Sequence, residues 1–175
     1  RRPKPRKTTN LTALDVAGVR SPTEIDGASL LPVVREDGHV LHPELYAELT
    51  YHAAYEPMRS IRTDRYRYTR RYDNRSAPVL PNLDDSPSKD ALLAAGWQHR
   101  PRRQELLFDC ALDPDNVTNL VDELPDVARD LGRRLDRWME RTGDPFVDGT
   151  GPTPPPGALA NDPDDRSPKQ EPKPL

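Results

Sequence analysis

Residues 44–72, ELYAELTYHAAYEPMRSIRTDRYRYTRRY, decide the fold. Apolar and polar residues alternate from Leu45 to Tyr51, which is the period-two pattern of a strand with two different faces. Pro57 opens a second run, Met58 to Thr63, and Thr63-Asp64 forms a turn before a third run in which tyrosines alternate with arginines. Strand-forming residues and short connections therefore predict an antiparallel meander of three strands.

The two faces of the first strand differ in polarity. Leu45, Ala47, Leu49 and Tyr51 share one face, which we expect to be apolar. The other face carries Glu48, Thr50 and His52 in a row. A polar face of this kind is either in contact with water or forms one wall of a site that another part of the protein completes.

The remaining elements complete an α+β fold. Glu105–Asp109 is predicted to be a fourth strand, and Ser86-Pro87 has the N-cap and first-turn residues of a helix start. Pro125–Arg141 is the strongest helix pattern. Its apolar face consists of Val127, Leu131, Leu135, Trp138 and Met139. We therefore predict a small antiparallel sheet of about four strands with a long amphipathic C-terminal helix packed on it.

Composition sets the expected domain boundaries. The chain has 175 residues, and its 21 prolines concentrate at the two ends. Residues 1–10 are expected to be a disordered basic tail, residues 11–150 the folded domain, and residues 151–175 a disordered Pro-rich tail that cannot bury enough apolar surface to order itself. The pattern from Asn10 to Gly18 resembles the last turns of a helix, so we expect that the chain is a piece of something longer.

Charge and cysteine content exclude several classes of protein. A net charge of −3 gives no global field that favours nucleic acid or acidic membranes. Cys110 is the single cysteine, so an intrachain disulfide is excluded. No stretch approaches the ~20 apolar residues of a membrane span, and the basic start lacks the apolar stretch of a secretory signal. These features predict neither a signal peptide nor a transmembrane segment in this chain and leave its compartment open.

Several stretches, taken in order, match one family. They are LDVAGV, DGASLLP, AELTYHAAYEPMRSIRTDRYRY, ELLFDCALDPDNVTNL and LDRWMERTGDPFVDG. The sequence resembles the C-terminal subdomain of a sulfatase, in the sulfamidase-like branch of the alkaline-phosphatase-like superfamily, over about residues 11–150. The resemblance implies a four-stranded antiparallel sheet and a long C-terminal helix that pack against a large α/β catalytic domain.

The resemblance supplies no catalytic or metal-binding residue in this chain. Sulfatases convert a Cys or Ser in a C-x-P-x-R or C-x-A-x-R motif to formylglycine, but Cys110 is followed by Ala-Leu-Asp-Pro. We interpret Cys110 as a buried or half-buried structural thiol. The family also holds a divalent cation, usually calcium, through carboxylate and amide oxygens. The pairs Asp73-Asn74, Asp84-Asp85 and Asp115-Asn116 fit loops, caps and turns better, so calcium is implied only for the complete enzyme.

Glu48 and His52 are the predicted substrate-binding residues. They lie four positions apart, on one face if the strand stays regular, in the stretch that the resemblance places towards the catalytic domain. In a complete enzyme, the carboxylate could accept a hydrogen bond from a sugar hydroxyl or amine, and the imidazole could donate one. The alternative interpretation is a solvated strand face with a Glu–His contact.

These observations lead to one main hypothesis and two alternatives. In the main hypothesis, the chain is the C-terminal part of a sulfatase-like hydrolase of sulfate esters or sulfamates and is not catalytic alone. Its partner would be the missing catalytic domain, or a separate chain carrying it, and the substrate a sulfated sugar or another sulfated small molecule. The first alternative is a free-standing module that binds a polyanion or single-stranded nucleic acid through interleaved arginines and tyrosines, against which the negative net charge argues. The second is a non-catalytic subunit that docks on another chain.

Overall fold

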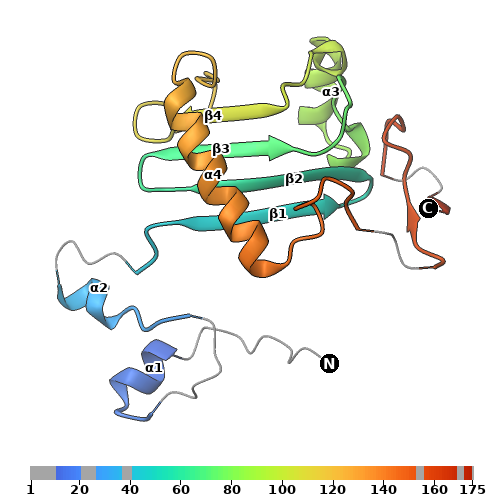
Figure 1. Cartoon of the computed structure of the whole chain (residues 1–175). Helices are drawn as coiled ribbons and strands as arrows, with labels where there is room; N and C mark the ends of the chain where they lie inside the picture. Colours follow the sequence, from blue (N-terminus) through green and yellow to red (C-terminus); the bar gives the residue numbers. More distant parts are fainter. Residues whose placement is uncertain (1–10, 21–26, 37–40, 153–155, 169–171, 175) are drawn as a thin grey trace. The chain divides into compact units, whose positions relative to one another are not determined.

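The computed structural model describes residues 11–20, 27–36, 41–152, 156–168 and 172–174 (Figure 1). Its contacts divide the chain into two units, residues 1–43 and 44–175. The first unit contains helices α1 (Leu11–Val16) and α2 (Leu31–Arg35), and the backbone N–H of Leu30 donates to Thr12 Oγ1. The predicted tail at residues 1–10 lies outside the described residues. The bounds of the folded domain, residues 11–150, stay a prediction.

The second unit is built on a four-stranded antiparallel sheet (Figure 1). Its strands are β1 (Leu45–Tyr51), β2 (Tyr55–Arg62), β3 (Tyr66–Arg71) and β4 (Glu105–Asp109), in the order β1-β2-β3-β4. The predicted meander and the fourth strand are confirmed. The long excursion between β3 and β4 contains η2 (Leu80–Asn82), α3 (Pro87–Ala94) and η3 (Trp97–His99).

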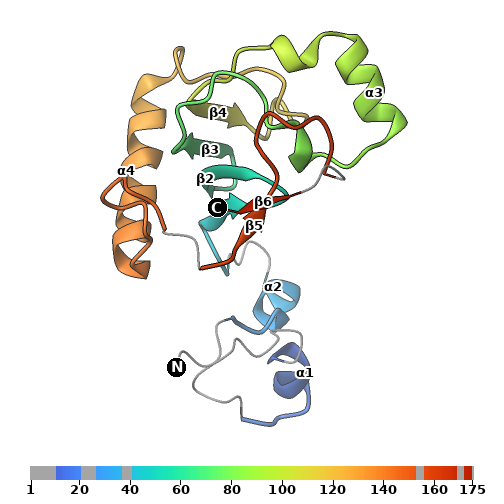
Figure 2. The ribbon, with the colours of Figure 1, turned by 90° about the vertical axis from the view of Figure 1, so that its right-hand side faces the viewer.

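Helix α4 (Pro125–Thr142) crosses one face of the sheet (Figures 1 and 2). Its buried face, predicted from the spacing of Leu131, Leu135 and Met139, meets Ile61, Tyr68 and Leu107 of the sheet in the main core. Gly132 leaves room for the end of the Arg70 side chain, because a Cβ atom there would lie 2.8 Å from Arg70 Nη2. Gly143, with φ of 64°, forms the left-handed C-cap that ends the helix. These contacts confirm the α+β fold with a long C-terminal helix on the sheet.

Helix α4 covers the face of β1 that carries Glu48, and the expected apolar face is partly open. Tyr46, directly opposite Ile61, stacks on Trp138 with ring centroids 4.9 Å apart and an interplanar angle of 2°. Leu45 on the other face is 56% exposed. The inner face is fixed by the large apolar residues of the other three strands, so the alternation within β1 alone does not identify it. Helix α4 therefore covers Tyr46, at the start of the same face.

The other side of the sheet carries the excursion between β3 and β4 together with the C-terminal segment (Figure 2). Ser86 is the N-cap of α3, as predicted, and its Oγ accepts a hydrogen bond from the backbone of Lys89. Short strands β5 (Leu159–Ala160) and β6 (Lys173–Pro174) pair with each other. The backbone N–H of Asn161 donates to Ala53 O at 2.8 Å, and Asn161 is buried.

Backbone pairing and polar contacts hold the described part of the C-terminal segment. The disordered tail expected at residues 151–175 from the low apolar content stays a prediction. Hydrophobic patterning does not detect such contacts, because backbone N–H and C=O groups are present in every sequence. Among the described residues, no helix has the length and apolar character needed to span a membrane.

Candidate functional site

Glu48 lies on β1 opposite Arg59 of β2. Its side chain is 65% exposed, and its Oε2 lies 4.0 Å from Arg59 Nε, at the limit of an ion pair. An exposed pair of this length contributes little to stability. The carboxylate therefore keeps most of its hydrogen-bonding capacity for water or for a ligand.

His52 lies beyond the end of β1. The β1–β2 register shifts between Leu49 and Tyr51, and β1 ends at Tyr51. The shift lies opposite the part of β2 that contains Pro57, which cannot donate a hydrogen bond to the sheet. His52 is exposed, and its backbone N–H donates to Ala54 O at 3.3 Å. The regular alternation that would place His52 beside Glu48 thus stops before His52, and no contact joins the two side chains in the described structure.

Arg59 is a buried cation opposite Glu48 on the neighbouring strand. It is 1% exposed, and its Nε donates to Asp144 Oδ2 at 2.6 Å while Nη1 donates to Leu49 O at 2.7 Å. Its guanidinium lies 4.7 Å from the centre of the Phe146 ring. Sequence analysis did not single out Arg59 among the arginines of this region. The burial of Arg59 could have been inferred from its position two residues before Ile61, which places both side chains on the face of β2 that α4 covers.

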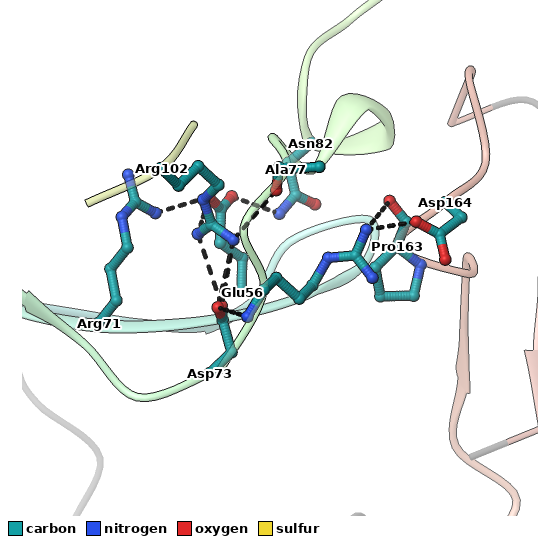
Figure 3. Close-up of polar contacts among 9 residues, drawn as sticks. Glu56, Arg71, Asp73, Ala77, Asn82, Arg102, Pro163 and Asp164 are labelled. Carbon is teal, nitrogen blue, oxygen red and sulfur yellow. Dashed lines mark hydrogen bonds and ion pairs between the residues drawn. The ribbon is translucent and has the colours of Figure 1, made fainter. Parts of the chain in front are cut away.

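A second buried charge network lies where β2 and β3 meet the excursion (Figure 3). Glu56 Oε1 accepts hydrogen bonds from Arg71 Nη1 and Arg102 Nη2, both at 2.9 Å. Arg102 also pairs with Asp73 at 3.2 Å, and both of these side chains are 6% exposed. Burial, and secondly the nearby charge of Arg71, lower the pKa of Arg102. The two carboxylates balance the two guanidiniums, so the network satisfies buried charges that would otherwise be costly.

This network connects distant parts of the second unit. Asn82 accepts a hydrogen bond from the backbone N–H of Ala54 and donates to Glu56 Oε2. Arg75 pairs with Asp164 of the C-terminal segment. The excursion and the C-terminal segment are thereby attached to the sheet by directional polar contacts.

The candidate metal and cysteine residues occupy structural positions. Asp73 is engaged by Arg102, and Asp85 pairs with Lys89. Cys110 is half-buried, with Sγ 3.8 Å from Asn116 Oδ1 in the turn after β4. No cluster of three or more His, Cys, Asp or Glu side chains suited to a metal ion occurs in the described part of the chain. These residues do not fit a calcium site.

Comparisons with known proteins point to one enzyme class. No family model matches the chain. An ulvan-active sulfatase from Formosa agariphila is 28% identical over 151 residues, which are 76% of this chain and 28% of that protein. A putative sulfatase from Bacteroides thetaiotaomicron has a TM-score of 0.53 at 23% identity, covering 82% of this chain and 26% of its own.

A third match is a solved structure in complex with its substrate D-glucosamine-2-N,6-O-disulfate. It has a TM-score of 0.50 and 20% identity over 78% of this chain and 24% of that one. These two structural similarities establish the shared fold, and the sequence match links that fold to sulfatases. The chain spans about a quarter of the length of these relatives. Together, the matches identify the chain as a homologue of sulfatases that corresponds to about a quarter of a sulfatase.

Proposed function

We propose that this chain is the C-terminal part of a sulfatase-like hydrolase that cleaves sulfate esters or sulfamates of sugars in its complete form. The observation that carries the proposal is the match of 76% of this chain to 28% of an ulvan-active sulfatase. The resemblance places the nucleophile, the calcium ion and the sulfate-binding groups in the catalytic domain, in the same chain or in a separate one. In this proposal the chain by itself does not catalyse the reaction, because Cys110 is followed by Ala-Leu-Asp-Pro and does not match the formylglycine motif.

Within this proposal, Glu48 and His52 contact the substrate. Glu48 has an exposed carboxylate with one distant ion-pair partner, which leaves it able to accept a hydrogen bond from a sugar hydroxyl or amine. His52 is exposed in the turn after β1 and can donate a hydrogen bond from its ring. Because the two residues lie on either side of the register shift, they contact different groups of the sugar.

The arginine-rich face gives little support to the nucleic-acid alternative. Arg65 pairs with Asp109, Arg70 with Asp136, and Arg71 with Glu56. Guanidiniums already engaged by carboxylates contribute less to the neutralisation of phosphates on which such binding depends.

The first test is the DNA upstream of Arg1. A C-x-P-x-R or C-x-A-x-R motif encoded there, in frame or one shift away, supports the proposal, and an unrelated upstream sequence contradicts it. The second test uses the longer protein encoded by that DNA, assayed on a sulfated sugar. Glu48→Gln and His52→Gln should each raise KM by about tenfold through a lost charged or directional hydrogen bond.

A matched control separates substrate contact from a general charge effect. Glu140 is exposed on α4, so Glu140→Gln should leave KM unchanged. Equal effects of all three variants would contradict the roles of Glu48 and His52. Turnover of a generic aryl sulfate by the 175-residue chain alone would contradict the proposal that catalysis needs a separate domain.

A further inference from the structure

A cavity of about 410 Å³ lies on the face of the sheet opposite α4. Leu106 and Phe108 contribute to it from β4, on the opposite side from the core residue Leu107. The excursion between β3 and β4 supplies another wall, and the turn after β4 supplies a third. The volume is in the range of pockets that hold small molecules.

The floor of the cavity consists of arginine side chains that are paired and held rigidly. Arg71 and Arg102 share the carboxylate of Glu56, and their side chains are only 15% and 6% exposed (Figure 3). Asn82, also in the lining, is held by the backbone of Ala54 and by Glu56. A floor fixed by so many directional contacts is preorganised, so a ligand need not order it.

The rim carries cationic groups that are open to a ligand. Arg100 is exposed, and its guanidinium makes no hydrogen bond or ion pair with any residue that the structure describes. Arg103 pairs with Asp122, but the two side chains are 54% and 72% exposed, so the pair is weak and readily exchanged. Four arginines thus line the cavity against one lining carboxylate, although Asp73 and Asp122 neutralise part of their charge from outside it.

An apolar surface lies beside these cations. Trp97 is half-buried at the start of η3, where the left-handed Gly96 (φ 80°) turns the chain at the end of α3. Leu83 and Val117 also line the cavity and are 37% and 80% exposed. An apolar, aromatic wall with a few placed charges is the usual composition of a small-molecule site, and guanidinium groups match the geometry of oxyanions.

We propose that this cavity binds a small anionic sugar unit. Arg100 and Arg103 contact its carboxylate or sulfate group, and Trp97 contacts its ring. The choice of an anion rests on the arginines, whereas the choice of a sugar rests on the proposed function. A compact cavity with a closed floor fits one such unit better than an extended strand of nucleic acid, which requires a groove along its backbone.

The test measures the binding of three sugars to the full 175-residue chain, monitored by NMR chemical shifts and by tryptophan fluorescence. The probes are D-glucosamine-2-N,6-O-disulfate, glucuronic acid and uncharged glucose. We expect saturable binding of at least one anionic sugar and at least tenfold weaker binding of glucose. The first two probes distinguish a sulfate from a carboxylate as the recognised group. Arg100→Gln should lower the affinity for the anionic sugar by about tenfold, as expected for one lost charged hydrogen bond.

Arg137→Gln is the matched control, because Arg137 is exposed on α4 and outside the cavity. It should leave the affinity unchanged. Trp97→Ala should abolish the fluorescence change, and circular dichroism shows whether that variant remains folded. Loss of affinity in Arg100→Gln but not in Arg137→Gln supports the site. Absence of saturable binding by both anionic sugars, equal binding of glucose, or tighter binding of oligouridylate at the same residues overturns it.

These outcomes are separate from those of the proposed function. If Arg100-dependent sugar binding is found but the longer protein fails to hydrolyse sulfated sugars, the cavity stands and the proposed function fails. If the longer protein is an active sulfatase and this chain binds no anionic sugar, the proposed function stands and the cavity proposal fails.

Discussion

Asp144→Asn should destabilise the sheet domain by about 3–5 kcal/mol, the usual cost of breaking a buried ion pair from one side. Asp144 is the carboxylate partner of Arg59, and their side chains are 1% and 2% exposed. Asparagine can still accept the hydrogen bond from the backbone N–H of Phe146, which Asp144 Oδ1 accepts at 2.8 Å. The substitution therefore removes the charge and keeps the local turn, leaving a buried guanidinium without its counter-ion.

The remaining partners of Arg59 cannot replace that charge. Leu49 O and Met58 O accept hydrogen bonds from it at 2.7 and 2.9 Å, but these are neutral carbonyl groups. Glu48 is charged, but it is 4.0 Å away and mostly in water. Glu48→Gln is thus the control and should lower the free energy of unfolding by at most about 1 kcal/mol.

Urea unfolding of the 175-residue chain, followed by circular dichroism, measures both changes. A double-mutant cycle sharpens the result. Arg59→Met alone leaves Asp144 buried without a cation, while Arg59→Met with Asp144→Asn leaves no buried charge. The double variant should therefore lose at least about 1 kcal/mol less than the sum of the single variants. A loss below 1 kcal/mol for Asp144→Asn, or additive single effects, would refute the reasoning.

Three further changes test other parts of the unit. Glu56→Gln should lower the free energy of unfolding by about 2–3 kcal/mol, because two half-buried arginines lose a charged acceptor; urea unfolding measures it. Ser86→Ala should lower the free energy of unfolding by about 1 kcal/mol because it removes the N-cap of α3, and urea unfolding measures this loss as well. Burial, and next the hydrogen bond to Glu44, raise the pKa of Tyr46 to about 12. Folding thus favours the neutral phenol, and this contribution to stability is complete below pH ~10 and lost as the pH rises through 12. Tyr46→Phe should remove that part of the alkaline loss, which unfolding measured across this pH range would show.

Local patterns in the sequence predicted the elements of the fold well. Helix α4 follows from the spacing of Leu131, Leu135 and Met139, and the start of α3 follows from Ser86-Pro87, because each signal lies within a few residues of the element that it defines. The meander follows in the same way from short turns between strands. None of these predictions needs knowledge of distant contacts.

Two of the parts that sequence reasoning missed depend on contacts between distant residues. The inner face of β1 is fixed by Ile61 and Trp138, which lie far along the chain from Tyr46. The burial of Arg59 depends on Asp144, 85 residues away. These two are tertiary effects that override the local alternation of apolar and polar residues. The register shift before His52 is local instead, because it arises from pairing with the nearby segment around Pro57 in the same hairpin.

The candidate substrate residue and the buried ion pair are physically connected, which makes their roles separable by experiment. Arg59 lies opposite Glu48 on the neighbouring strand and is held in place by Asp144, and its Nη1 donates to Leu49 O of β1 next to Glu48. Removing Glu48 alone should weaken substrate binding in the longer protein while leaving stability almost unchanged. Removing Asp144 should lower stability and also weaken binding, since the hydrogen bond from Arg59 that anchors β1 next to Glu48 is no longer held in place. A Glu48 variant that lost as much stability as the Asp144 variant would instead show that Glu48 is part of the buried network, and its role in substrate binding would have to be abandoned.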